Sequence, residues 1–377
     1  MKKIFFLILF AIILTLNVQA QAMDVNEIYW QQYALSGAGE LYDNLTPEAK
    51  GAMDRLGLDP KEPSSISNFN LDNVFLLIRD FFKSGGTVPI KAGVSVFAVL
   101  LLAALVEGVG SGVERKGFDG IYTYVCMASI AAIVFLPLFQ TILSTVNAIK
   151  GTGVFMLSFV PVYGGIILAS GRVSTGMGFQ TLLLAAAQVV VQAASFVITP
   201  LIGMYLAVNL SSSVSPMVKT AKLSEGLKKA SSFLLTLLLT TFVGILGIQT
   251  AISAAGDNIT QKTSKVLLGT FVPVVGPVLA ESVGTVQSCV GLLKSSVGIY
   301  GVIALCFMLL PILIELIFWR LTVIISSAAA DMMSLPRFSE FLKAVDAVVA
   351  LLLGIVLMIA VLFIISLTVV SLAGGSA

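Results

Sequence analysis

The side chains in this sequence with the clearest chemical potential are carboxyl and amide groups inside long apolar runs. Glu315 lies within PILIELIFWR, Glu281 follows an apolar stretch that contains Pro and Gly, and Gln188 and Gln192 are four residues apart. An ionisable group inside a membrane is costly and marks either a proton or cation path or a buried polar pair. Both roles stay open for Glu315, whose expected neighbour is a polar group on another helix. The two glutamines share one helix face, so they are candidates for hydrogen bonds that hold helices together.

Other kinds of chemistry have little support in the sequence. The chain has no histidine, and its three cysteines, Cys126, Cys289 and Cys306, form no CxxC pair. Histidine is the commonest general base and metal ligand, and paired cysteines are the usual mark of a zinc or redox site. The sequence also contains no phosphate-binding loop and no HExxH motif. We therefore expect no catalytic residue, no metal site and no cofactor, and the chain is predicted not to be an enzyme.

Two apolar stretches share the motif FVPV and a glycine soon after it. FVPVYGG covers Phe159–Gly165, and FVPVVGP covers Phe271–Pro277. Proline removes a backbone donor and glycine loosens the chain, and irregular backbone at membrane depth occurs only beside protein or water. We expect two re-entrant or broken helices next to a polar path, with a kinked but ordinary transmembrane helix as the alternative. The candidate residues of these pore or broken-helix elements are Pro161, Gly164, Gly165, Pro273, Gly276 and Pro277.

Composition identifies the scaffold that must position these groups as an integral membrane protein. Hydrophobic residues make up 57% of the 377 residues and charged residues only 11%, whereas soluble domains carry about 25% charged residues. We predict an all-α polytopic fold, because a helix satisfies its own backbone hydrogen bonds in lipid.

Residues 1–22 have the features of a secretory signal peptide. Lys2 and Lys3 precede the apolar run Ile4–Leu16, which is too short to span a membrane comfortably, and Ala20-Gln21-Ala22 matches a cleavage site. We expect the signal to be cleaved, with an uncleaved anchor as the alternative. Either way, the chain that follows is placed outside the cytoplasm.

Residues 23–86 are predicted to form an acidic, helical, extracytoplasmic region, because they hold ten acidic and five basic residues. Thr46 is expected to be a helix N-cap with Pro47 as the first helical residue, since a hydroxyl can bond to the free N–H groups of the first turn. Gly57 is expected to end this helix, because glycine readily adopts the left-handed conformation found there.

The last part of this region leads into the polytopic membrane domain, residues 87–377. Leu71–Lys83 is amphipathic and is expected either on the membrane surface or packed in a small bundle. Ser84–Thr87, with two glycines, is the expected hinge into the membrane. About six apolar segments of the domain are long enough to span, at 88–109, 121–148, 179–210, 231–255, 297–325 and 348–372.

The membrane domain is predicted to contain internal repeats. The two FVPV motifs start 112 residues apart, and KLSEGLKK (Lys222–Lys229) aligns with RFSEFLKA (Arg337–Ala344). Pro89, Pro200 and Pro311 are spaced by 111 residues, and each lies in or at the mouth of an apolar run. These spacings indicate a unit of about 112 residues whose third copy lacks FVPV.

The distribution of charge favours six spans. With the N-terminus outside, the connectors 111–118, 211–230 and 326–346 face the cytoplasm. Together with Arg320 they carry nine basic residues, against five on the external loops after Thr123. If both FVPV segments crossed as well, there would be eight spans and the count would be eight against six. Eight spans is therefore the less favoured arrangement.

One connector, MVKTAKLSEGLKKA, is amphipathic and basic. We expect it on the cytosolic side, either lying on anionic lipid or forming a docking site for a cytosolic partner. Its candidate residues are Lys219, Lys222, Lys228 and Lys229.

The order of these features resembles the stage III sporulation protein AE family of endospore-forming bacteria. The residues that carry the resemblance best are KVLLGTFVPVVGPVLAESVGTV (Lys265–Val286) and the connector Lys222–Lys229. The similarity covers nearly the whole chain after the signal peptide. In this chain Gly276 is followed by Pro277, where the family is expected to have a second glycine.

The resemblance implies a subunit of a sporulation channel. Family members lie in the mother-cell membrane around the forespore and belong to a secretion-like apparatus that supports late forespore gene expression. The implied partners are an ATPase and ring-forming proteins of the same operon, a forespore-membrane protein across the intermembrane space, membrane lipid and further copies of the chain, but no nucleic acid. The alternative is a stand-alone secondary transporter that uses Glu281 or Glu315 to bind a proton or cation.

Overall fold

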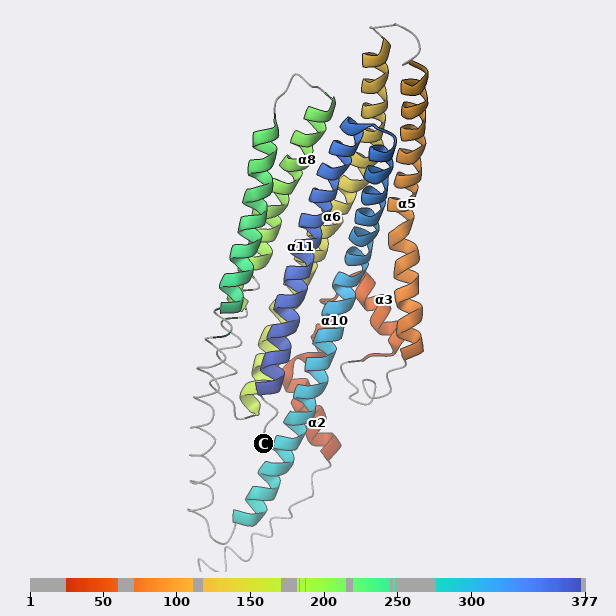
Figure 1. Cartoon of the computed structure of the whole chain (residues 1–377). Helices are drawn as coiled ribbons and strands as arrows, with labels where there is room; N and C mark the ends of the chain where they lie inside the picture. The colour runs from red at the N-terminus through yellow and green to blue at the C-terminus, as the bar shows by residue number, and fades with distance from the viewer. Residues whose placement is uncertain are drawn as a thin grey trace, which may run out of the picture.

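The computed structural model describes residues 25–59, 71–110, 118–170, 182–214 except 183 and 187, 220–244, 247 and 276–373. Within these ranges the chain is helical and contains no strand, which confirms the all-α prediction (Figure 1). A helix at 221–244 lies between the labelled elements α8 and α10. The labelled elements are α2 (Val25–Ser36), the 3-10 helix η1 (Ala38–Leu41), α3 (Pro47–Leu56), α5 (Leu71–Gly110), α6 (Phe118–Ala169), the π-helical segment η2 (Ala193–Ile198), α8 (Thr199–Val214), α10 (Gly276–Met332) and α11 (Pro336–Ala373).

Six helices of the described chain are long and apolar enough to cross a membrane, which is the number predicted. Each of them overlaps one predicted span. In Figure 1 they lie alongside one another as an elongated bundle. The six candidate spans are Asp72–Gly108, Ile121–Ala169, Leu184–Ser213, Ala221–Gly244, Val290–Met332 and Pro336–Ile364.

Two of the helices are much longer than one membrane crossing. α6 has 52 residues and α10 has 57. At a rise of 1.5 Å per residue these lengths are about 78 and 85 Å, against a hydrocarbon core of about 30 Å. Each helix therefore has room for a membrane-crossing part and an extension beyond it.

The first FVPV stretch lies inside α6, which continues without interruption past Pro161. The prediction of a broken or re-entrant element is therefore wrong for this copy, and the stretch is part of one continuous helix. Gly164 is buried and Gly165 is exposed within the same helix. Proline in a helix interior removes one hydrogen bond, so neighbouring packing must stabilise the helix here.

That packing comes from an aromatic ladder on α6. Phe155, Phe159 and Tyr163 are fully buried and stack in series, with successive ring centroids 5.5 and 5.3 Å apart. Gly298 and Gly301 of α10 face Tyr163 and Phe159, and a Cβ at either glycine would collide with the aromatic ring. The FVPV residues thus stay helical because their aromatic side chains fill the space that two glycines leave on α10.

The second FVPV stretch lies outside the described residues, apart from its last two positions. α10 begins at Gly276, which places Pro277 in its first turn. Proline is favoured there, because the first N–H groups of a helix have no acceptor within it. Pro273 is not described, so a break at this copy stays a prediction.

The predicted hinge at Ser84–Thr87 is wrong, because α5 is one helix from Leu71 to Gly110. Its two glycines serve close packing. A Cβ at Gly85 would lie 3.2 Å from the Ile314 side chain, and a Cβ at Gly86 would lie 3.1 Å from the Phe318 ring. Small residues let two helix axes approach, so these glycines bring α5 against α10.

The amphipathic segment Leu71–Lys83 forms the first turns of α5. Phe81 lies near Phe307 of α10, with ring centroids 6.5 Å apart, and Leu77 is buried. Phe75 is 71% exposed. Two placements were predicted, on the membrane surface or packed against other helices. The buried face of this segment packs against another helix.

The start and stop signals of α3 are confirmed. The Thr46 hydroxyl accepts a hydrogen bond from the Ala49 N–H at 3.4 Å, and Pro47 is the first helical residue. Gly57 ends the helix in the left-handed conformation, with φ of 63°. The chain is thereby turned so that α3 can reach α5.

The three prolines spaced by 111 residues all lie in helices. Pro89 and Pro311 are inside α5 and α10, and Pro200 is the second residue of α8. Before Pro200 the helix widens into η2, where the Thr199 N–H and hydroxyl both bond to the Ala194 carbonyl. The common repeat that these prolines indicate remains a prediction.

The helix ends that flank the predicted connectors lie at one end of the bundle, at the top of Figure 1. α6 begins there, α8 ends there, the helix at 221–244 begins there, and α10 turns into α11. Side chains from the starts of α6, the helix at 221–244 and α11 line one common cavity. This arrangement is the one that six spans require.

Candidate functional site

The deepest polar network in the described chain joins α6 and α10. The Thr141 hydroxyl donates to Glu315 Oε1 at 2.6 Å and accepts from Trp319 Nε1 at 2.9 Å. Thr141 and Trp319 are 1% and 0% exposed. A hydroxyl has one hydrogen to give, so the longer contact of Thr141 with the Pro137 carbonyl, 3.2 Å, is an alternative to the Glu315 bond. Thr141 therefore fixes the direction of the Glu315 carboxylate.

α10 brings Glu315 and Trp319 to the same face, because they are four residues apart in a helix. The sequence predicted a polar neighbour for Glu315 on another helix, and Thr141 of α6 is that neighbour. Glu315 also lies close to α5, since a Cβ at Gly85 would be 3.3 Å from the Glu315 backbone nitrogen. The carboxylate thus sits where three helices meet.

A cavity of about 480 Å³ opens beside Glu315. Four elements supply its walls, namely the start of α3 and parts of α5, α6 and α10. Two carboxylates, three hydroxyls and one amide face it. The lining residues are Thr46, Pro47, Glu48, Ser84, Gly85, Ser144, Asn147, Ala148, Met308, Pro311, Ile312 and Glu315.

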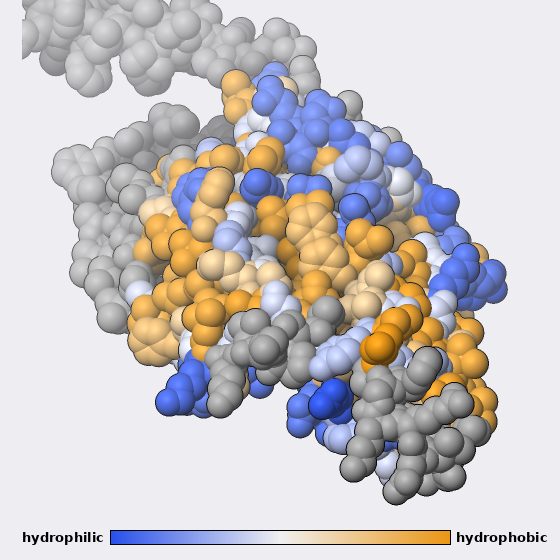
Figure 2. Space-filling view, turned by 90° about the horizontal axis from the view of Figure 1, so that it is seen from above, coloured by the Kyte–Doolittle hydropathy of each residue, from blue (hydrophilic) through white to orange (hydrophobic). Residues whose placement is uncertain are grey.

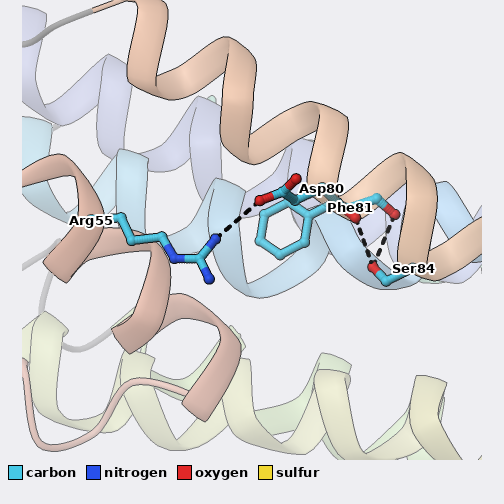
Figure 3. Close-up of polar contacts among 4 residues, drawn as sticks. All are labelled: Arg55, Asp80, Phe81 and Ser84. Carbon is cyan, nitrogen blue, oxygen red and sulfur yellow. Dashed lines mark hydrogen bonds and ion pairs between the residues drawn. The ribbon is translucent and has the colours of Figure 1, made fainter.

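The N-terminal region closes one side of this cavity. Arg55 of α3 reaches across to Asp80 of α5, with Arg55 Nη1 and Asp80 Oδ2 3.2 Å apart (Figure 3). One turn later, the Ser84 hydroxyl bonds back to the carbonyls of Asp80 and Phe81. Both members of the ion pair are more than half exposed, so the pair orients α3 more than it stabilises the fold.

Oxygen atoms dominate this cavity, which suits a proton or a hard cation more than a soft metal. Among the described residues, however, no three His, Cys, Asp or Glu side chains are grouped closely enough to hold a metal ion. The arrangement can therefore bind a proton or a loosely held cation at Glu315, and it also joins α6 to α10 through a buried polar contact. Both roles predicted for Glu315 have a physical basis here.

Two comparisons with known proteins bear on identity. The family model described as "Stage III sporulation protein AE" matches residues 64–374. The chain belongs to the stage III sporulation protein AE family. It is 28% identical over 232 residues to "Stage III sporulation protein AE" of Bacillus subtilis (strain 168), which covers 61% of this chain and 57% of that relative. The chain thus matches less than two thirds of that relative's length, and no solved structure matches it.

The family match includes the Glu315 network but begins after α3. In this stage III sporulation protein AE member, the wall formed by Thr46–Glu48 therefore lies outside the matched residues. The carboxylate and its two partners on α6 and α10 lie inside them.

The other candidate polar residues of this family member have different surroundings. Arg320, one turn after Glu315 on α10, is exposed, and its Nε lies 3.4 Å from Asp346 Oδ1 of α11. Gln188 is half-buried and Gln192 is exposed, and neither bonds to another helix within the described ranges. Glu281 belongs to α10, but its side chain is outside the described set.

Sequence reasoning missed Thr141 and Trp319. Both lie in predicted apolar spans, at 121–148 and 297–325, to which the sequence assigns no polar contact at these positions. The available signal was a pair of threonines, Thr141 and Thr145, on one face of the predicted span at 121–148. A second missed feature is Lys294 of α10, which is only 6% exposed.

Proposed function

We propose that this protein is a multi-pass membrane subunit of a secretion-like channel apparatus that links mother cell and forespore and supports late forespore gene expression. Family membership gives sporulation as the process. The single observation that favours a subunit of an assembly is the separation of two distinct ends. The N-terminal region packs around one part of the bundle, and the basic connectors gather at the other end (Figure 1).

Helix geometry gives the size of that separation. The N-terminal region is packed near Ser296 and Tyr300 of α10 through Tyr29 and Tyr33. From Ser296 to Met332, where α10 ends beside the connectors, there are 36 residues, or about 54 Å of helix. The nearest contact of the region, where Thr46–Glu48 lie beside Glu315, is 17 residues or about 26 Å from Met332. The part of the region around α2 therefore lies more than one hydrocarbon thickness of about 30 Å from the connectors, and the start of α3 lies closer.

In this proposal the protein lies in the mother-cell membrane around the forespore. The signal peptide places residues 23–86 in the intermembrane space, where a forespore-membrane protein and exported ring-forming proteins would meet them. The connectors face the mother-cell cytosol, where the ATPase of the same operon would be. A homo-oligomer is compatible with this arrangement.

Affinity purification tests the proposal. A tagged full-length chain would be extracted in mild detergent from sporulating cells, and the proteins that accompany it would be identified. Recovery of a cytosolic ATPase together with exported ring-forming proteins is the expected result. Recovery of the chain alone, as a discrete homo-oligomer, would contradict it.

A stand-alone secondary transporter is the second candidate function. The observation in its favour is the cavity of about 480 Å³ beside Glu315, which offers a carboxylate at the junction of three helices. Glu315→Gln would abolish proton-coupled or cation-coupled uptake by a reconstituted carrier. The same variant would leave the assembly with its partners intact if Glu315 is only a structural contact.

A further inference from the structure

Another cavity, separate from the one beside Glu315, lies at the connector end. It has a volume of about 810 Å³. The two aligned connector sequences, Lys222–Lys229 and Arg337–Ala344, form facing parts of its wall. The start of α6 and the end of α8 complete it. Seen from this end, the molecule shows hydrophilic patches beside large hydrophobic areas (Figure 2).

Three basic side chains line this cavity: Lys222, Lys228 and Arg337. None of them makes an ion pair within the described residues. Two nearby lysines differ, since Lys229 lies 2.7 Å from Glu225 and Lys343 lies 2.9 Å from Asp331. The three cavity cations are therefore available to an anion. Two carboxylates also line the cavity: Glu225 is paired with Lys229, and Glu340 makes no ion pair within the described residues, so the three cations face one unpaired carboxylate.

The position of two of these cations in their helices is unusual. Lys222 is the second residue of the helix at 221–244, and Arg337 is the second residue of α11. The N-terminus of a helix carries a partial positive charge, so basic residues are disfavoured in the first turn. An anion between the two helix ends would be attracted by both side chains and by both sets of free N–H groups. The same feature occurs in both aligned connectors.

A buried hydroxyl also lacks a partner at this site. Thr220 Oγ1 exposes less than 1 Å² and makes no hydrogen bond within the described residues, although the residue lines the cavity. Next to it, the Ser224 hydroxyl donates to Asn209 Oδ1 at 3.0 Å. Because this oxygen has almost no accessible surface, a ligand held in the cavity does not reach it, and a phosphate there would meet the cationic side chains instead.

The position of the cavity along the helices favours a lipid as the source of the anion. The cavity is lined by the ends of four of the six candidate spans. The adjoining helix at 221–244 is the least buried candidate span, with 11% of its most apolar window buried. It presents Leu223, Phe233 and Leu237 outward, each about half exposed or more. Acyl chains can lie along that face while the headgroup enters the cavity.

We propose that this cavity binds the phosphate group of an anionic phospholipid through Lys222, Lys228 and Arg337. The N–H groups at the N-termini of the two helices add hydrogen-bond donors. The lipid bridges the loosely packed helix at 221–244 to α11, and so fastens the two aligned connectors to each other. The binding is noncovalent and does not depend on the channel function.

Lipid retention and thermal stability of the full-length protein test this proposal. The protein would be purified in mild detergent, stripped of lipid and mixed with phosphatidylglycerol, with phosphatidylcholine or with inorganic phosphate. We expect phosphatidylglycerol alone to be retained in native mass spectra and to raise the unfolding midpoint. A triple variant, Lys222→Gln, Lys228→Gln and Arg337→Gln, should bind it about tenfold more weakly or worse, because three charge-assisted contacts are lost.

The matched control is Arg79→Gln, Lys83→Gln and Lys91→Gln. It removes the same charge from exposed positions on α5 that do not line the cavity. This control should bind phosphatidylglycerol as the unaltered protein does. If the triple variant does not fold, Lys222→Gln and Arg337→Gln are tested singly.

Three outcomes would overturn the proposal. Equal stabilisation by inorganic phosphate would make the site one for a soluble anion. If the α5 control bound phosphatidylglycerol as weakly as the triple variant, the loss of binding would reflect the overall charge of the protein and not this cavity. Absence of any preference for phosphatidylglycerol in the unaltered protein would leave the basic end free for a protein partner.

Discussion

At the level of single residues, the Thr141 hydroxyl holds the Glu315 network together. It is both donor to Glu315 and acceptor from Trp319, so its removal leaves two polar groups without their partner. Thr145, one turn further along α6, is fully buried as well, but its hydroxyl bonds only to the Thr141 carbonyl of the same helix. The two threonines differ in what they connect, and this allows a matched comparison.

Thr141→Val should destabilise the protein by about 1–3 kcal/mol, because buried groups that lose a hydrogen-bond partner carry a desolvation penalty. The loss of stability from Thr145→Val should be clearly smaller, because this change removes no hydrogen bond to another helix. Thermal unfolding in detergent, followed by tryptophan fluorescence, measures both. Equal losses in the two variants would mean that the interhelical network contributes nothing beyond the local bond.

A second prediction at this scale concerns the tyrosines of α2. Burial raises the pKa of Tyr33 and of Tyr29 above the usual value for tyrosine. The neutral phenol is thus favoured in the folded protein, while the unfolded chain ionises near pH 10. The stability that these groups contribute is complete below that pH and is lost as the pH rises further. Tyrosinate absorbance should therefore show these two groups titrating only above the ordinary range, and Tyr33→Phe should remove one of the late-titrating groups. Titration of all tyrosines together near pH 10 would contradict the burial.

At the level of elements, the FVPV stretch of α6 is a packing surface. Its aromatic ladder requires glycine at two positions of α10, because a side chain at Gly298 or Gly301 would overlap Tyr163 or Phe159. The helix tolerates Pro161 since this contact replaces part of the stability that the missing hydrogen bond removes.

Gly301→Ala should therefore destabilise the bundle by about 1–3 kcal/mol through overpacking. Gly291→Ala is the matched control on the same helix, because a Cβ there meets nothing within 4 Å. That control should be neutral or stabilising by about 0.5–1 kcal/mol, since alanine is the better helix former. Thermal unfolding midpoints in one detergent distinguish the two. The same sign for both variants would contradict close packing of α6 on α10.

At the level of the whole molecule, the ends of four candidate spans meet around the connector cavity. In the proposed six-span topology, the N-terminal region and the connectors lie on opposite sides of the membrane. The connector end is the basic one, which agrees with the tendency of basic loops to stay in the cytoplasm.

Cysteine labelling in intact cells checks this orientation. In a chain with Cys126, Cys289 and Cys306 replaced, Asp43→Cys should react with a membrane-impermeant thiol reagent from outside. Lys222→Cys should react only after the membrane is permeabilised. Both positions are exposed, so burial would not prevent the reaction. Labelling of Lys222→Cys from outside would overturn the six-span arrangement.

The sequence by itself determined the features that depend on short stretches of chain. Apolar length gave the number of spans, because the thickness of a bilayer sets how many residues must be apolar. Thr46, Pro47 and Gly57 gave the limits of α3, since capping involves only neighbouring backbone groups. The FVPV block and the connector gave the family.

Only the tertiary structure decided what happens where helices meet. Whether Pro161 breaks α6, and whether Gly85 and Gly86 form a hinge, depends on the side chains of α10 that pack against them, and these lie far away in the sequence. The link between Thr141 and Glu315 joins residues 174 positions apart. The cavity between the two connectors likewise exists only because α11 and the helix at 221–244 begin at the same end. Local propensity cannot specify such contacts, because their energy comes from groups that the fold alone brings together.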